Sequence, residues 1–155
     1  MNTKTIFISL LLPFLFFKSF AQSAIDSLAI ENTCRNYIEG WKEGDLEKIS
    51  AAVSPELVKR TVMVDGESKS YTSGMSYSLF RTFSRTSRNG IQMQDFLPEE
   101  EFSYEVLIYD IMGDFAVAKT IVPKYGFFDY CQLAKFDGEW KIFNILWGWM
   151  PQQQL

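Results

Sequence analysis

Hydrophobic and polar positions alternate most regularly near the C-terminus, from Asp129 to Trp149. This stretch is typical of two strands joined at Asp137-Gly138, a residue pair that favours a tight hairpin turn. With that turn, Gln132 faces Phe143 across the hairpin, and Tyr130 faces Ile145. Both faces carry apolar side chains, so the hairpin is predicted to lie inside its sheet and to be covered on both sides.

The N-terminal half shows helical spacing instead. Apolar residues recur every three or four positions from Ile30 to Trp41, which predicts a helix over residues 23–41 with Ser23 as its N-cap. Gly44-Asp45 ends this helix and starts a short second one, which stops before Pro55. A weak strand over 56–63, a polar loop over 68–73 and a third helix over 72–86 are predicted next.

Two further strands are predicted over residues 101–110 and 115–122, before the final hairpin. Helices therefore come first and strands follow. This order predicts an α+β fold in which about three N-terminal helices pack on one face of a curved antiparallel sheet. Helices laid against a bent sheet enclose a cone, whose mouth is a natural small-molecule pocket.

The first residues have the features of a secretory signal peptide. Lys4 precedes an apolar run from Ile6 to Phe17, and Ser19-Phe20-Ala21 forms a site with small residues at both ends. We expect cleavage after Ala21, which makes residues 1–21 the signal peptide and residues 22–155 a single secreted or periplasmic domain without stable membrane association. An uncleaved anchor is the alternative.

Composition narrows the chemistry. Removal of Lys4 and Lys18 leaves 13 basic and 19 acidic side chains, a net charge of −6, which argues against a nucleic-acid partner. The absence of histidine removes the commonest general base and metal ligand, so no metal site is predicted, and no cofactor-binding motif is found. Cys34 and Cys131 are expected to face inward, either as a disulfide or as buried thiols.

Several short motifs occur together in this chain. They are residues 37–41 (YIEGW), Gly44-Asp45, residues 55–60 (PELVKR), residues 113–119 (GDFAVAK), Asp129-Tyr130 and residues 137–142 (DGEWKI). In this combination they resemble one family, the putative lumazine-binding branch of the nuclear transport factor 2-like superfamily. This superfamily has a cystatin-like fold and also holds ketosteroid isomerase and the polyketide cyclases. The resemblance covers nearly all of the mature chain and implies a homodimer formed through the exposed sheet face.

The resemblance to ketosteroid isomerase implies a role for Tyr37, whose spacing to Asp45 matches the tyrosine that donates a hydrogen bond to a developing oxyanion. The position of the neighbouring acid corresponds to Gln132, which cannot exchange a proton. The position of the general base falls on residues 59–61, where no carboxylate stands, and Ser54 replaces a histidine usual in this branch. Asp129 is expected to point to the opposite sheet face from Gln132.

Strand alternation then predicts a ligand-binding face. It consists of six residues of the hairpin, closed by two aromatic residues of the first helix: Tyr130, Gln132, Phe143, Ile145, Trp147 and Trp149, with Tyr37 and Trp41. The alternative is that these side chains form the core. The sequence favours a protein that binds a small aromatic or apolar ligand without a catalytic acid–base pair. An isomerase, cyclase or dehydratase that uses Tyr37, or a ligand-free dimeric interaction module, are the alternatives.

Overall fold

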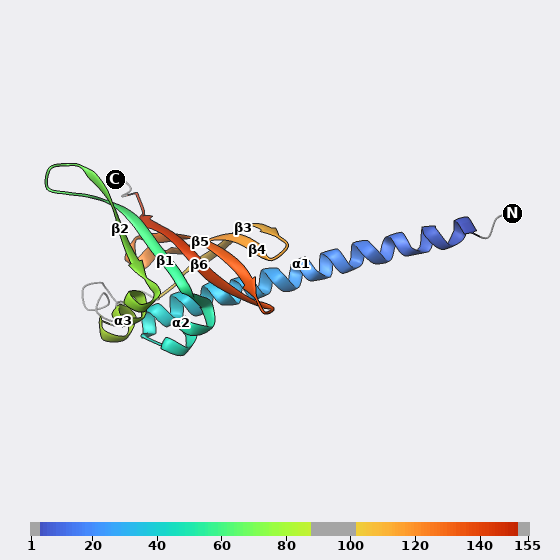
Figure 1. Ribbon diagram of the computed structural model, residues 1–155, viewed down its shortest axis with the longest axis horizontal. Helices are drawn as coiled ribbons and strands as arrows, with labels where there is room; N and C mark the ends of the chain where they lie inside the picture. The colour runs from blue at the N-terminus through green and yellow to red at the C-terminus, as the bar shows by residue number, and fades with distance from the viewer. Residues whose placement is uncertain (1–3, 88–101, 152–155) are drawn as a thin grey trace.

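The computed structural model describes residues 4–87 and 102–151, with side chains from Ser23 onward. A six-stranded curved sheet is covered on one face by helices (Figure 1). The elements, in chain order, are α1 (Lys4–Glu43), α2 (Leu46–Ala52), β1 (Val53–Val64), β2 (Ser70–Ser76), α3 (Tyr77–Ser87), β3 (Glu105–Met112), β4 (Phe115–Val122), η1 (Pro123–Tyr125), β5 (Phe127–Phe136) and β6 (Glu139–Trp149).

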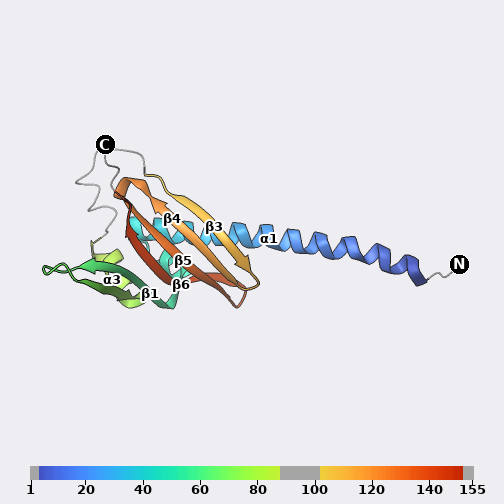
Figure 2. The ribbon, with the colours of Figure 1, turned by 90° about the horizontal axis from the view of Figure 1, so that it is seen from above.

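The sheet has the strand order β2-β1-β6-β5-β4-β3. All neighbouring strands are antiparallel except β1 and β6, which are parallel. The sheet is therefore mixed, whereas the sequence predicted a purely antiparallel one. No hairpin constrains the β1–β6 pair, because α3 and four strands separate the two in sequence. Helix α1 packs against β3 and β6, and α3 packs against β1 (Figures 1 and 2). The predicted α+β class is confirmed.

Residues 70–76 differ from the prediction. They form β2, which pairs with β1 from Val58 to Val64, and α3 begins only at Tyr77. A turn that begins at Asp65 joins β1 to β2, and the Asp65 N–H donates to the Lys69 carbonyl at 2.9 Å. This Ser- and Thr-rich segment has little strand propensity of its own, so pairing with β1 decides its conformation.

Of the two residues predicted to start a helix, Asp45 does so and Ser23 does not. Asp45 caps α2 as predicted, since its Oδ1 accepts from the backbone N–H groups of Glu47 and Lys48 at 2.9 and 3.1 Å. Ser23 does not cap a helix, because α1 already runs from Lys4.

The final hairpin has the predicted turn and a register that changes halfway. Asp137 and Gly138 both have positive φ (50° and 87°), as a primed two-residue turn requires. Lys135 pairs with Trp140 next to the turn, but Gln132 pairs with Asn144 and not with Phe143 as predicted. Phe143 is the extra residue of a β-bulge. Beyond a bulge the facing of the strand is shifted by one residue, so Ile145 of β6 shares its face with Cys131 of β5 and not with Tyr130, as the sequence predicted.

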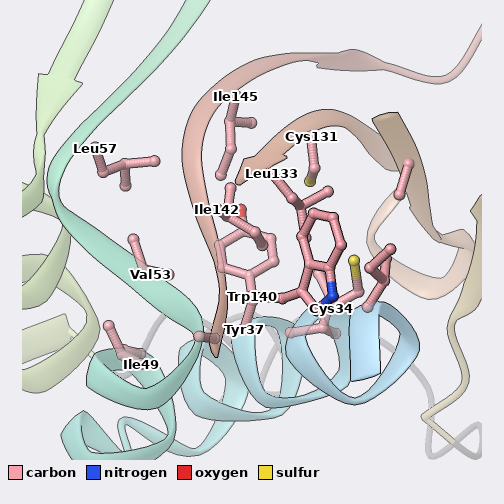
Figure 3. Packing of buried hydrophobic residues seen from close by; sticks show 14 of the residues in the cluster. Cys34, Tyr37, Ile49, Val53, Leu57, Cys131, Leu133, Trp140, Ile142 and Ile145 are labelled. Carbon is pink, nitrogen blue, oxygen red and sulfur yellow. The ribbon is translucent and has the colours of Figure 1, made fainter. Parts of the chain in front are cut away.

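The core lies between the helices and the concave side of the sheet (Figure 3). Helix α1 contributes Ile30, Cys34, Tyr37 and Ile38, and the sheet contributes a facing layer that includes Cys131, Ile142 and Ile145. Helix α2 lies very close to α1. A Cβ placed on Gly40 would stand 2.9 Å from Ile49 Cγ1 and 3.1 Å from the Asp45 carbonyl oxygen, so only glycine fits there.

Candidate functional site

A fully buried carboxylate stands on the concave side of the sheet. Along β5, Phe127, Asp129 and Cys131 are buried, while Tyr130 and Gln132 are exposed. The period of two in a strand therefore places Asp129 toward the helices. Asp129 and Gln132 lie on opposite faces of the sheet, as predicted. The prediction assigned Gln132 to the face toward the helices, however, and the structure places Asp129 there and Gln132 outside.

Asp129 receives three hydrogen bonds from three different elements. Tyr37 of α1 donates to Oδ2 at 3.1 Å, and Thr120 of β4 donates to the same oxygen at 3.3 Å. Lys59 of β1 donates to Oδ1 at 2.7 Å and forms an ion pair with the carboxylate. A buried carboxylate needs such partners, because loss of hydration disfavours its charge.

Lys59 also contacts Tyr37, because its Nζ donates a second hydrogen bond to the Tyr37 hydroxyl at 2.7 Å. Tyr37, Lys59 and Asp129 therefore form one polar cluster. The Tyr37 hydroxyl therefore accepts from Lys59 and donates to Asp129. Burial and the Asp129 charge raise the pKa of Tyr37 well above its ordinary value. Tyr37 thus stays protonated and its proton is already donated within the protein.

Aromatic rings surround the Lys59 ammonium. Its Nζ lies 5.4 Å from the ring centroid of Tyr37, 5.6 Å from Trp147, 5.9 Å from Phe127 and 6.0 Å from Phe80. These distances are within the range of cation–π attraction. The side chain of Lys59 keeps 11% of its surface exposed. An ammonium group has three N–H donors, and within the described residues two of them have partners.

The structure brings together half of the predicted ligand-binding residues. Tyr37, Ile145 and Trp147 lie on the concave side with Asp129 and Lys59, since Ile145 pairs with Cys131 and Trp147 pairs with Asp129. Trp41 stands next to them, with its ring 5.2 Å from that of Phe127.

The other four predicted residues lie elsewhere. Tyr130 and Gln132 project from the outer face, and Trp149 is 58% exposed at the end of β6. Phe143 sits in the bulge and lines a shallow depression of about 200 Å³ with Gln132. The bulge is the physical reason. Continuous alternation across the hairpin would place Ile145 on the face of Tyr130, whereas the extra residue Phe143 places it on the face of Cys131.

Lys59 and Asp129 are the residues that the sequence reasoning did not place in the site. One signal for Asp129 was available. Cys131 was expected to face inward, and a residue two positions earlier on a strand shares its face. For Lys59, the resemblance to ketosteroid isomerase indicated only that the general-base position falls on residues 59–61. Its contacts with both Tyr37 and Asp129 depend on the parallel pairing of β1 with β6.

The outer face of the sheet carries a second, exposed polar group. Arg60 donates to Asn144 Oδ1 at 3.0 Å, and Asn144 donates to Gln132 Oε1 at 2.9 Å. Large apolar side chains flank this row, among them Tyr109, Tyr130 and Leu146, which are 55%, 40% and 51% exposed.

Three further observations limit the chemistry of the described part of the chain. No three His, Cys, Asp or Glu side chains come together there as a metal site would require. No helix of that part is long and apolar enough to cross a membrane. Cys34 and Cys131 are free thiols, and both are buried as expected.

Comparison with known proteins agrees with this geometry. A family model described as putative lumazine-binding matches residues 26–148. No curated protein matches the chain.

Solved structures show the same fold. A protein of unknown function from Shewanella baltica, described as nuclear transport factor 2-like, is 20% identical over 83% of this chain and 97% of its own, with a TM-score of 0.60. One from Silicibacter pomeroyi with the same description is 13% identical over 82% and 98%, with a TM-score of 0.65. A cystatin-like domain of unknown function from Nostoc punctiforme is 17% identical over 84% and 80%, with a TM-score of 0.55.

Proposed function

The chain belongs to the putative lumazine-binding family of the nuclear transport factor 2-like superfamily, and from this membership and its buried polar cluster we propose that it binds a small aromatic or apolar ligand at the Lys59 end of the cone. Lys59 is the polar contact of this site. Trp147 and Phe80, whose rings face the ammonium, are its apolar walls.

The observation that carries the proposal is the Lys59–Asp129 ion pair inside an apolar core. Asp129 is fully buried, and only a tenth of the Lys59 side chain is exposed (11%). Replacement of a buried ion pair by apolar residues of similar volume is often neutral or stabilising by about 1–4 kcal/mol, so stability alone does not account for this pair. Buried ionisable groups with specific charge partners are found preferentially at functional sites.

The geometry defines how a ligand would be held. Lys59 has a third N–H beyond the two that it donates to Tyr37 and Asp129, and this donor suits an acceptor oxygen on the ligand. The surrounding rings favour a flat or apolar body next to that oxygen. A polar tip on an apolar molecule is therefore the ligand shape that fits best.

Binding is supported better than isomerase-type catalysis with Tyr37 as the oxyanion donor. Such a donor needs a proton that is free to meet the substrate. The Tyr37 proton is donated to Asp129, and the hydroxyl oxygen is occupied by Lys59. Asp129 itself is occupied by three donors, which leaves it poorly placed to remove a proton from a ligand.

The test uses the dye 1-anilinonaphthalene-8-sulfonate, which joins aromatic rings to an acceptor group. The wild-type full-length chain is compared with an apolar triple variant (Lys59→Met, Asp129→Leu, Tyr37→Phe), which removes both charges and the Tyr37 hydroxyl and so leaves no unpaired charge. We expect saturable binding of one dye per chain by the wild type. We expect the triple variant to bind about tenfold more weakly or worse, the loss of roughly 1.4 kcal/mol from one charge-assisted hydrogen bond.

Leu146→Ala is the matched control. Leu146 neighbours Trp147 in β6 but lies on the outer face, where it is 51% exposed. Dye binding by this variant should equal that of the wild type. Equal binding by the wild type and the triple variant, or loss of binding in Leu146→Ala, would contradict the proposed site.

Two further proposals concern the setting of this site. We propose that the chain is exported and cleaved after Ala21, which N-terminal sequencing of the mature protein would test by reading Gln22 first.

We also propose a homodimer formed through the outer sheet face around Tyr130, supported by the exposed aromatic and apolar side chains there. Tyr130→Glu should then sediment as a monomer under conditions in which the wild type is a dimer.

A further inference from the structure

Two cysteines, Cys34 and Cys131, lie next to the polar cluster of Tyr37, Lys59 and Asp129 and face each other across the core. Cys34 lies on α1, one turn before Tyr37, and Cys131 lies on β5, two residues after Asp129. Both are completely buried. Figure 3 shows their sulfur atoms directed into the space between helix and sheet, one from each side. A hydrogen bond with Cys34 and burial raise the pKa of the Cys131 thiol well above its ordinary value.

This environment decides when the two thiols can react. Exchange with a disulfide requires a thiolate and access for the oxidant. In the folded chain both thiols are covered by the core, and Cys131 is held in its protonated form. In the unfolded chain both are exposed, with ordinary reactivity. The oxidation state of the pair is therefore fixed while the chain folds.

We propose that Cys34 and Cys131 are a covalent cross-linking site, which forms an intrachain disulfide when the chain folds in the presence of a small-molecule disulfide. The thiolate of one cysteine attacks the oxidant and releases one small thiol. The thiolate of the other then attacks the mixed disulfide and releases a second. Two protein thiols are oxidised to one disulfide, and one oxidant disulfide is reduced to two thiols, so atoms and electrons balance.

The bond would join α1 to β5 at positions separated by 97 residues in the sequence. A cross-link over so long a segment restricts the unfolded chain strongly, which stabilises the folded state. It would also tie together the two elements that carry Tyr37 and Asp129. Once the core has closed over it, the bond would be shielded from reductants, as the thiols are shielded from oxidants.

The test is refolding of the full-length chain from urea in either oxidised or reduced glutathione. Each product is denatured, treated with iodoacetamide and weighed by mass spectrometry. After oxidative refolding we expect a monomer that is lighter by two hydrogens than the reduced chain and takes up no alkyl group. Its Tm should exceed that of the reduced protein by about 5 °C or more. Cys34→Ala and Cys131→Ala should each take up one alkyl group or carry one glutathione.

Uptake of two alkyl groups by the wild type after oxidative refolding would overturn the proposal, and so would covalent dimers as the main product. Because these readouts use the wild-type chain, they hold even if a cysteine variant fails to fold. Shielding is tested separately by adding reduced glutathione to the folded oxidised protein. The bond should persist there and disappear when urea is added, whereas equally fast reduction in both would overturn the shielding.

Discussion

Tyr37 on the first helix donates a hydrogen bond at 3.1 Å to Asp129 on β5, 92 residues later in the chain. Lys59 lies at 2.7 Å from both partners and completes a closed set of contacts among α1, β1 and β5. The set holds a charge pair in the part of the protein where charges are most costly.

Removal of the carboxylate from this set should be severe. Asp129→Asn keeps the shape of the side chain but leaves the Lys59 ammonium without its counter-charge. We expect a loss of about 3–5 kcal/mol in the free energy of unfolding, measured by urea denaturation. Asp110→Asn, an exposed carboxylate on β3, is the control and should change stability by less than about 0.5 kcal/mol. A small loss in Asp129→Asn would mean that the ion pair is not buried in solution.

Removal of the entire set should be mild by comparison. In the triple variant Lys59→Met, Asp129→Leu, Tyr37→Phe, no charge remains unpaired, and only the neutral Thr120 hydroxyl loses its bond to Asp129. We expect its unfolding free energy to exceed that of Asp129→Asn by at least about 2 kcal/mol. The same urea titration checks this, and a triple variant less stable than the single one would show that the cluster holds the fold together.

Gly40 permits the close approach of α1 and α2. In Gly40→Ala the new methyl group would meet Ile49 Cγ1 at 2.9 Å, so the helices would have to separate. Overpacking of this kind costs about 1–3 kcal/mol, which thermal denaturation would show as a lowered Tm. Gly66→Ala is the control, because nothing lies within 4 Å of the position of its Cβ. Similar effects of both changes would contradict the packing argument.

Stability should fall in acid partly through Glu39. Hydrogen bonds from Lys48 and Tyr104 lower the pKa of Glu39. A carboxyl group whose pKa is lower in the folded than in the unfolded chain stabilises the fold above its unfolded pKa, and this contribution is lost as the pH falls through the folded value. We therefore expect the wild type to lose more stability than Glu39→Gln between about pH 5 and pH 3.

The control for Glu39 is Glu56→Gln, which changes an exposed carboxylate on β1. Its stability should follow the wild type through the same pH range in urea titrations. Parallel curves for the wild type and Glu39→Gln would refute the assignment.

At the alkaline end, burial and the Glu39 bond raise the pKa of Tyr104 to about 12, so this tyrosine should ionise late in an ultraviolet titration.

The sequence predicted the fold because local signals and global arrangement agree in most elements. The Asp137-Gly138 turn, the Asp45 cap and the strand over 115–122 each stand where residue chemistry places them. The site was harder to predict, because a single bulged residue, Phe143, decides which face of β6 each later side chain occupies. Nothing in a pattern of alternating residues marks where an extra residue will be accommodated.

Lys59 illustrates the same limit in another way. Its place beside Asp129 follows from the parallel pairing of β1 with β6, a contact between segments far apart in the chain. Local patterns describe which residues share a face of one element, but not which elements become neighbours. Tyr37 could be identified from its motif alone, whereas its contacts with Lys59 and Asp129 follow only from the topology of the whole sheet.

The central claim is that the Lys59 cluster holds a ligand. Native mass spectrometry tests it most directly, on the wild type and the apolar triple variant purified from the native host under identical conditions. We predict that the wild type carries a small molecule, released on denaturation, and that the triple variant carries little or none. The same load in both proteins, or no load on either, would contradict the claim.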